Sequence, residues 1–333
     1  MKGKKQVLNS RCEIYNYLDY SFADHLVQDI TLGMTGKKKY IPSKYFYDLN
    51  GSQLFEEICT LPEYYLTRTE ISILENIAPY IIGSSSQIDL VEMGSGSDTK
   101  IARLIRASSY LQGEGIRYIA FDVSESALYE AARCLTSQFP RIQVLGYVAD
   151  FTRHLHHLPH VENTIFILLG STIGNFTDEE MYTLFCDVSR AMNPGDRFLL
   201  GIDMVKDPVI LEAAYNDSLG ITAEFNKNIL NVINREVSAD FELDDFDHLA
   251  FYNTGREQIE MHLVANRPVT VIFEKIPLTV HIKKGESIFT EISRKFSRKR
   301  IEDTIRPCNL KINAWHTDPD RWFSLVELSK VFQ

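Results

Sequence analysis

The stretch from residue 88 to residue 202 alternates short apolar runs with longer amphipathic ones, and this alternation constrains the fold more than any other feature. We expect strands at 88–92, 118–122, 142–147, 164–169 and 197–202. Helices are expected at 99–108, 124–138 and 179–192, where apolar residues recur at helical spacing. Repeated strand–helix–strand units form parallel sheets with right-handed crossovers. The sequence therefore predicts a doubly wound α/β core.

The two flanks of this core do not follow the same rhythm. Residues 1–69 are rich in tyrosine, and we expect helices there and no strand that joins the sheet. A helical stretch from Asp207 to about residue 235 precedes three short antiparallel strands, and the chain becomes helical again from 286 to about 305. The three strands are expected at 258–265, 269–274 and 278–282, and two closing strands at 310–315 and 322–328.

The closing strands read as a hairpin that adds an antiparallel edge to the parallel sheet, because Asp318-Pro319-Asp320 between them favours a turn. We therefore expect a Rossmann-like core with a mixed sheet, made of residues 70–205 and 286–333. A second, α+β domain that binds substrate is expected from two separated segments, 1–69 and 206–285.

The charge balance argues against a nucleic-acid partner. Lys and Arg number 35 against 45 Asp and Glu, a formal net charge of −10, whereas proteins that grip a phosphate backbone are usually basic. The one dense basic stretch, 294–300, is interpreted as a solvated helix face. Because no apolar run approaches the ~20 residues of a membrane helix and no signal peptide is recognisable, we expect a cytoplasmic protein without a membrane partner.

Cysteine and histidine usage gives no sign of a metal site. The five cysteines are widely spaced and lack a C-x-x-C pair, which is typical of a reduced intracellular protein without disulfides or thiolate-bound metal. His154, His156, His157 and His160 lie within seven residues, but no carboxylate stands at matching spacing. We interpret them as surface or loop histidines and expect no metal.

Polar residues follow three consecutive strands of the predicted sheet. Gly94 and Gly96 form a turn after the first strand, Asp122 ends the second, and Asp150 with Phe151 ends the third. Ligands bind open α/β sheets at this edge, where a carboxylate can accept from ribose hydroxyls. Each aspartate could instead cap a helix.

Two cofactors compete for this edge. A nicotinamide dinucleotide needs a third glycine for its pyrophosphate, but residue 99 is Thr. S-Adenosylmethionine carries no phosphate and suits the acidic groups Glu92, Asp122 and Asp150 around its ribose, adenine and cationic sulfonium. The closing hairpin also fits a methyltransferase sheet better than a dehydrogenase sheet. We therefore favour S-adenosylmethionine.

The chain resembles the histidine-specific N-alpha methyltransferases of ergothioneine biosynthesis. The resemblance is carried by 44–58 (KYFYDLNGSQLFEEI) and 61–70 (LPEYYLTRTE), and continues in order through 92–96, 121–122, 169–176, 203–207, 213–217 and 290–296. Leu66 departs from the proline usual in the family after the tyrosine pair. The resemblance implies a class I methyltransferase core that holds S-adenosylmethionine, with an inserted domain that closes over an amino acid.

The resemblance also assigns roles to individual residues. It implies cofactor contacts from Gly94, Lys100, Asp122, Asp150 and Phe151. For the amino acid, it implies that Asn175 and Tyr215 meet the carboxylate and that Tyr47, Tyr64 and Gly170 surround the α-amine, with Tyr47 and Tyr64 as catalytic candidates. Phe55 is implied to pack on the substrate, Glu291 and Ser293 to hold the imidazole, and Met261 to lie along its side.

The chemistry of Glu291-Ile292-Ser293 agrees with an imidazole ligand. Two residues that stand two apart share a face only in an extended backbone, so we expect this tripeptide to precede a helix that opens near Ser293. A carboxylate and a hydroxyl can satisfy both imidazole nitrogens, whereas an indole has one donor and no acceptor. The alternative is a helix start with Ser293 as its cap and Glu291 exposed.

The predicted reaction is methylation of the α-amino group of L-histidine, with three rounds giving the trimethylated betaine hercynine. Alternatives are a relative that acts on another amino acid or small amine, a non-catalytic S-adenosylmethionine-binding module, and a nucleic-acid methyltransferase. The negative charge disfavours the last, and the tyrosines, Asn175 and Glu291 disfavour the module. We expect a monomer.

Overall fold

The computed structural model describes residues 4–18, 22–82, 87–107, 115–159 and 163–332. The chain divides into two compact units. The first comprises Met1–Asp19, Arg68–Met204 and Phe296–Gln333, and the second comprises Tyr20–Thr67 and Val205–Lys295.

The first unit is built on a nine-stranded mixed sheet, counted over the described residues. In sheet order the strands are β1 (Lys4–Asn9), β2 (Cys12–Asn16), β6 (Gln143–Val148), β5 (Ile116–Asp122), β4 (Ile88–Met93), β7 (Thr164–Leu168), β8 (Arg197–Asp203), β15 (Phe323–Lys330) and β14 (Leu310–Thr317). Strands β6, β5, β4, β7 and β8 run parallel, and β15 joins β8 antiparallel as the predicted closing hairpin. This topology confirms the predicted Rossmann-like core with a mixed sheet.

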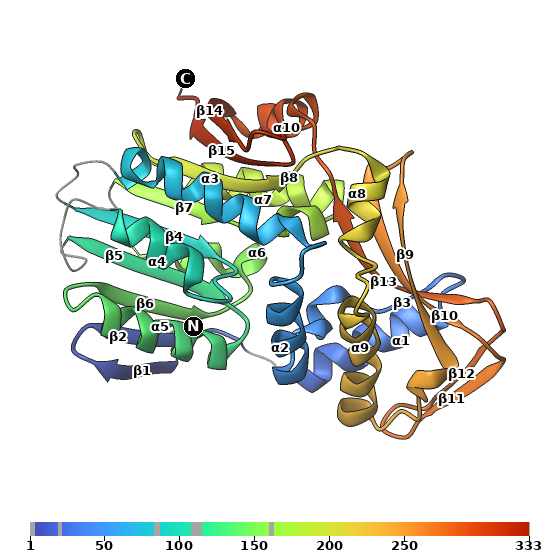
Figure 1. Cartoon of the computed structure of the whole chain (residues 1–333). Helices are drawn as coiled ribbons and strands as arrows, with labels where there is room; N and C mark the ends of the chain where they lie inside the picture. The colour runs from blue at the N-terminus through green and yellow to red at the C-terminus, as the bar shows by residue number, and fades with distance from the viewer. Residues whose placement is uncertain (1–3, 19–21, 83–86, 108–114, 160–162, 333) are drawn as a thin grey trace. The chain divides into compact units, whose positions relative to one another are not determined.

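Helices cover both faces of this sheet (Figure 1). They are α3 (Tyr65–Ile82), whose first turn falls in the second unit, α4 (Thr99–Arg106), α5 (Glu125–Gln138), α6 (Phe151–His154), α7 (Asp178–Ala191) and α10 (Arg298–Ile305), with short 3-10 turns η3 (Leu155–His157), η4 (Thr172–Asn175) and η6 (Arg306–Cys308). Strands β4 and β7 are buried along their whole length, as expected for parallel strands covered on both faces. The strand order reverses between β4 and β7, which marks the ligand-binding edge.

The N-terminal strands β1 and β2 were not predicted, and the expectation that 1–69 holds no strand of the sheet is wrong. Strand β2 pairs in parallel with β6, and β1 turns back antiparallel on β2. Cys12 and Ile14 are buried while Glu13 and Tyr15 are more exposed, so β2 follows a period of two. The run is only five residues long, and a period of two over so few residues is a weak signal beside the helical patterns that follow.

The second unit combines helices with a four-stranded sheet, counted over the described residues. The strands in order are β3 (Lys39–Tyr40), β13 (Ser287–Arg294), β10 (Gln258–Ala265) and β9 (Phe246–Asn253), beside a separate hairpin of β11 (Val269–Phe273) and β12 (Leu278–Ile282). The helices are α1 (Phe22–Thr35), α2 (Leu49–Ile58), α8 (Pro208–Ala213) and α9 (Ile221–Val237), with 3-10 turns η1 (Ser43–Phe46) and η5 (Leu243–Asp245). Helix α9 packs against α2 and β9 and supplies much of the apolar core.

Strand β13 corrects the prediction that the chain is helical from residue 286. Antiparallel pairing with β10 and a short parallel pairing with β3 hold 287–294 extended, and α10 begins only at Arg298. Ser297, not Ser293, caps that helix by accepting from the N–H of Arg300. The basic stretch is also only partly a solvated face, because Lys295 is fully buried whereas Arg298 and Lys299 are exposed.

The boundaries of the two units differ substantially from the predicted segments at two places, and by one or two residues near 68 and 205. Residues 1–19 belong to the first unit through β1 and β2, and residues 286–295 belong to the second unit through β13. Both differences follow from strand pairing between distant segments, which local composition does not reveal.

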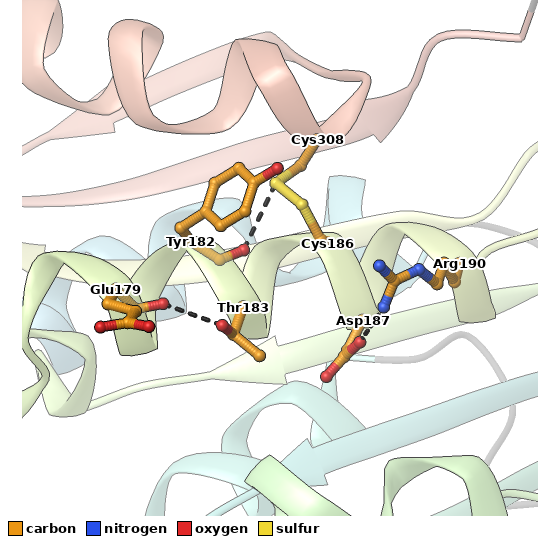
Figure 2. Close-up of a disulfide and its surroundings, with 7 residues drawn as sticks. All are labelled: Glu179, Tyr182, Thr183, Cys186, Asp187, Arg190 and Cys308. Carbon is orange, nitrogen blue, oxygen red and sulfur yellow. Dashed lines mark hydrogen bonds and ion pairs between the residues drawn. A yellow bond between two sulfur atoms is a disulfide. The ribbon is translucent and has the colours of Figure 1, made fainter.

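A disulfide joins Cys186 on α7 to Cys308 in η6 (Figure 2), with the two sulfur atoms 2.08 Å apart. The expectation of a chain without disulfides is therefore wrong. These cysteines stand 122 residues apart, so spacing along the chain gave no indication of their contact. Cys12, Cys59 and Cys134 carry reduced thiols. Among the described helices, none combines the length and the apolar character that crossing a membrane requires.

The cysteine pairing predicts a specific labelling pattern. Alkylation in denaturant without reductant is expected to label Cys12, Cys59 and Cys134 and to leave Cys186 and Cys308 unlabelled, because a disulfide sulfur is no nucleophile. Peptide mass spectrometry before and after reduction checks this, with Cys59 as the internal control. Labelling of Cys186 before reduction would contradict the bond.

Candidate active site

The predicted cofactor residues of the first unit lie at one edge of its sheet. Gly94 follows β4, Asp122 ends β5, Asp150 follows β6 and Gly170 follows β7. Because these strands are parallel neighbours, their carboxyl ends meet at the same edge. The fold therefore brings together the residues that the sequence marked at successive strand ends.

The glycine turn after β4 wraps around Asp122. Gly94 and Gly96 have φ values of +71° and +49°, which glycine adopts readily. The N–H of Gly96 donates to Asp122 at 3.0 Å, and the N–H of Ser124 donates to the same carboxylate at 2.8 Å. Burial raises the pKa of Asp122, and these backbone hydrogen bonds oppose the rise. A Cβ on Gly94 would lie 3.5 Å from the ring of Phe151, so turn and ring are neighbours.

Asp150 takes the capping role that the sequence left open. One of its oxygens accepts from the N–H of Thr152 at 2.9 Å and from the Thr152 hydroxyl at 2.6 Å, at the start of α6. The neighbouring Phe151 is partly exposed, and its ring meets that of Phe176 edge-on. The second oxygen of Asp150 lies 3.8 Å from a side-chain nitrogen of Arg153.

Glu70 is a residue that sequence reasoning missed. Its side chain is fully buried on α3, accepts from the N–H of Gly170 at 2.8 and 3.0 Å, and pairs with the Lys100 ammonium at 2.6 Å. It therefore ties the strand end at Gly170 to a predicted cofactor residue on α4. Glu70 is the last residue of the family motif at 61–70, and this position was the only indication in the sequence of a functional role. A Cβ on Gly201 would come 2.2 Å from the same carboxylate. The glycine at position 201 of β8 therefore leaves the space that the Glu70 carboxylate occupies.

Glu92 lies inside β4 rather than on the expected acidic rim. It is buried and accepts from the Tyr118 hydroxyl at 2.5 Å. Burial raises the pKa of Glu92 to about 8, and the hydrogen bond from Tyr118 opposes the rise. At neutral pH its carboxyl is therefore mostly protonated and adds little negative charge to the edge.

The donors and acceptors at this edge fit S-adenosylmethionine. Asp122 can accept from ribose hydroxyls, Phe151 offers an aromatic face, and Lys100 supplies a partly exposed ammonium for a carboxylate. Gly94 and Gly170 keep the backbone open, since a Cβ on Gly170 would come 3.1 Å from the Lys100 nitrogen. Among the described residues no cluster of His, Cys, Asp or Glu could hold a metal ion.

The histidines after β6 have other partners. His154 accepts at Nδ1 from the N–H of Asp150 at 3.1 Å, and His157 stacks on Tyr17 with ring centroids 4.1 Å apart. His160 lies outside the described residues.

The second unit carries a row of aromatic rings. Tyr47 meets Phe55 edge-on at 5.6 Å between ring centroids, Phe55 meets Tyr64 at 6.2 Å, and Tyr64 meets Tyr215 at 6.2 Å. Tyr47 is 43% exposed, whereas Tyr64 and Tyr215 are buried. Burial raises the pKa of Tyr64 well above its ordinary value. Four predicted substrate residues are therefore brought together.

Strand β13 places the predicted imidazole pair on one face. Glu291 and Ser293 stand two apart in an extended strand, so both side chains point the same way, as the sequence predicted. Met261 on β10 lies directly opposite Glu291, and side chains opposite each other in an antiparallel pair share a face. Burial raises the pKa of Glu291 to about 7, while Lys295 opposes the rise.

A buried hydrogen-bond cluster joins this strand to the aromatic row. The Tyr215 hydroxyl donates to the Ser293 hydroxyl at 2.7 Å, and the Lys295 ammonium donates to both, at 2.9 Å to Ser293 and 3.1 Å to Tyr215. Lys295 is a second residue that the sequence did not single out as functional. Lys295 lies in the basic stretch 294–300, whose sequence predicts a solvated helix face.

Gly170 and Asn175 were predicted with the substrate residues but belong to the first unit. The N–H of Gly170 donates to Glu70, so the backbone of Gly170 can offer an amine only its carbonyl oxygen as a hydrogen-bond acceptor. Asn175 ends η4 and is partly exposed. The cap of α7 is Thr177, which forms a capping box with Glu180, so Asn175 is not the helix cap considered as its alternative role.

Comparison with known proteins found several similar chains. The solved structure of the glycopeptide N-methyltransferase MtfA complexed with sinefungin is 12% identical, covers 86% of this chain and 98% of that chain, and has a TM-score of 0.44. Ergothioneine biosynthesis protein 1 of Schizosaccharomyces pombe is 27% identical over 308 residues, which cover 89% of this chain and 40% of the relative.

Two bacterial relatives match almost end to end. The histidine N-alpha-methyltransferase of Mycolicibacterium smegmatis is 40% identical over 314 residues, 93% of this chain and 97% of the relative. That of Mycobacterium tuberculosis is 37% identical over 322 residues, 96% of this chain and 100% of the relative. Residues 26–330 match the family described as "Histidine-specific methyltransferase, SAM-dependent". The chain therefore belongs to the histidine-specific, S-adenosylmethionine-dependent methyltransferases.

Proposed function

We propose that this protein methylates the α-amino group of L-histidine, with S-adenosylmethionine as the methyl donor. The observation that carries the proposal is the shared face of Glu291, Ser293 and Met261 on the paired strands β13 and β10, in a chain of this family. A carboxylate and a hydroxyl side by side match the two nitrogens of an imidazole.

The residues of the first unit are proposed to hold the methyl donor. Asp122 accepts from the ribose hydroxyls, Phe151 packs on the adenine beside Asp150, and the turn at Gly94 admits the ligand. Lys100, fixed by Glu70, meets the carboxylate of the amino-acid part. Bound S-adenosylmethionine supplies a methyl group activated by its sulfonium.

The residues of the second unit are proposed to recognise histidine. Glu291 accepts from one imidazole nitrogen, Ser293 serves the other, and Met261 packs along the ring. An indole would leave the Ser293 hydroxyl without a ring acceptor, and an unpaired buried polar group costs about 1–3 kcal/mol. Phe55 packs on the substrate, and Asn175 is proposed to meet its carboxylate. Tyr215 donates its single O–H to Ser293, so that proton is not available to the carboxylate.

The chemistry required of the protein is alignment of a free amine. The α-amino group of a peptide chain has a pKa of about 7.7–8.0, and the adjacent carboxylate of a free amino acid raises it further. The amine must therefore lose a proton before its lone pair can attack. Because the raised pKa of Tyr64 keeps its phenol neutral, Tyr64 acts by hydrogen bonding, and water receives the proton, either directly or through the hydroxyl of the half-exposed Tyr47. Aromatic faces stabilise the ammonium products by cation–π attraction, which supports the proposal of three successive methylations to hercynine.

The protein is further proposed to act as a cytoplasmic monomer on a small molecule rather than on nucleic acid or a membrane. The net charge of −10 supports the exclusion of a phosphate backbone as the partner.

A substrate panel tests the proposal directly. With S-adenosylmethionine present, mass spectrometry is expected to find one, two and three added methyl groups on histidine and none on tryptophan or arginine. Methylated tryptophan without methylated histidine would contradict histidine as the substrate and would identify tryptophan in its place. Accumulation of monomethylated histidine would contradict only the proposed trimethylation.

The two ion pairs between α3 and α4 provide a matched test of the donor site. Glu70→Gln removes the buried partner of Lys100 and is expected to weaken S-adenosylhomocysteine binding at least tenfold in calorimetry. Glu75→Gln breaks the exposed pair with Arg103 and is expected to change binding less than threefold, because such pairs contribute about 0–1 kcal/mol. Equal losses in both variants would contradict the role of Glu70.

The raised pKa of Glu291 predicts a pH dependence of histidine binding. Below about pH 7 the carboxyl gains a proton and loses acceptor capacity, so affinity is expected to fall as pH falls, up to about tenfold per unit. Glu291→Gln is expected to weaken histidine binding above pH 7. It is also expected to remove the pH dependence caused by Glu291, so that only the pH dependence caused by the titration of histidine itself remains.

Glu286→Gln is the control for this profile, because hydrogen bonds from the Lys283 N–H and Lys39 lower the pKa of Glu286 and keep it ionised. Calorimetry with S-adenosylhomocysteine present measures all three proteins. An unchanged profile in Glu291→Gln would contradict the assignment.

A further inference from the structure

Lys295, the last residue of the second unit, has a fully buried charged side chain. Its nitrogen lies 2.9 Å from the Ser293 hydroxyl oxygen, 3.1 Å from that of Tyr215 and 4.8 Å from the centre of the Tyr215 ring. Removing an ammonium from water is costly unless it is hydrogen-bonded, so such burial points to a role. The proposed reaction does not yet use this lysine.

The directions of the hydrogen bonds follow from the chemistry of the groups. An ammonium donates and never accepts, so Lys295 donates to Ser293. The Tyr215 hydroxyl donates to Ser293 as well. A serine hydroxyl has two lone pairs and one proton. Both lone pairs of Ser293 are therefore occupied, and the group can offer a further ligand only its own O–H.

Glu291 supplies the opposite function on the same face of β13. As a carboxylate it accepts and cannot donate. Together, Glu291 and Ser293 present one acceptor and one donor to a ring. The complement is a ring with one N–H and one unprotonated nitrogen, which describes neutral imidazole in a single tautomer. An imidazolium has two N–H groups, and a pyrrole ring lacks the acceptor.

We propose that Lys295 is a positioning residue that fixes the Ser293 hydroxyl as a hydrogen-bond donor, so that the second unit selects the neutral imidazole of histidine in one tautomer. This inference rests on the proposed function. It assigns the discrimination between ring types to a lysine that does not itself contact the ring.

Ring-labelled histidine tests the tautomer in the unmodified protein. With S-adenosylhomocysteine present, the ¹⁵N spectrum of bound, imidazole-labelled histidine is expected to show one N–H nitrogen and one unprotonated nitrogen. A bound imidazolium, or an averaged mixture of the two tautomers, would overturn the proposal.

Lys295→Met tests the role of the ammonium. The readout is the ratio of kcat/KM for histidine to kcat/KM for a pyrrolylalanine. This analogue keeps one ring N–H and has a C–H group in place of the other ring nitrogen. Without Lys295, Ser293 can turn its proton inward, so the ratio is expected to fall at least tenfold, mainly through KM for histidine. S-Adenosylhomocysteine affinity is expected to stay within threefold.

Two further variants make the test specific. Lys39→Met removes a partly buried lysine that pairs with Glu286 beside the same sheet, and it is expected to leave the ratio unchanged. In a Ser293→Ala background, Lys295→Met is expected to have no further effect on the ratio, because its action passes through that hydroxyl. An equal loss for both substrates would instead make Lys295 a general charge or a structural residue, and would overturn the proposal.

The outcomes separate this inference from the proposed function. If the unmodified protein neither binds nor methylates histidine, the proposed function fails. If it methylates histidine and Lys295→Met keeps the ratio, only the inference fails. Should Lys295→Met not fold, Tyr215→Phe removes the other donor to Ser293 and is expected to lower the ratio as well, and an unchanged ratio there would count against the inference.

Discussion

The extended backbone of β13 is the constraint on which the second unit depends. Pairing with β10 holds Glu291 and Ser293 on one face and sets Met261 opposite the carboxylate, and β3 pairs with the strand nearer its start, at Ile288 and Phe289. If this segment were helical, the two side chains would diverge, and an acceptor and a donor could not meet one ring. The chemistry proposed for histidine is thus a consequence of strand register.

Both units use buried charge to position polar groups, but they do so differently. In the first unit, Glu70 neutralises Lys100 and binds a backbone N–H, so that the charge is compensated within the protein. In the second unit, Lys295 is surrounded by two hydroxyls and lies near a carboxyl whose pKa burial raises to about 7. The first arrangement stabilises a strand end. The second is proposed to direct the hydroxyl of Ser293 and the carboxyl of Glu291 toward a ligand.

The sequence predicted the elements whose signal is local. The central strands are apolar throughout, and the residues at their ends fall on one edge because parallel strands align. Strands β2 and β13 were missed since they are short or polar and owe their extended form to partners far along the chain. For the same reason Lys295 looked like part of a solvated basic run, and Cys186 gave no sign of meeting Cys308. The site residues came chiefly from family resemblance, and hydrogen-bond directions required coordinates.

The bond between Cys186 and Cys308 has a topological consequence. The whole of 205–295, which forms the larger part of the second unit, lies within the covalent ring that this bond closes. A single backbone cut anywhere in that ring leaves one molecule with both halves still attached. The chain can therefore be nicked in the inserted segment without its pieces parting, as long as the sulfur–sulfur link survives.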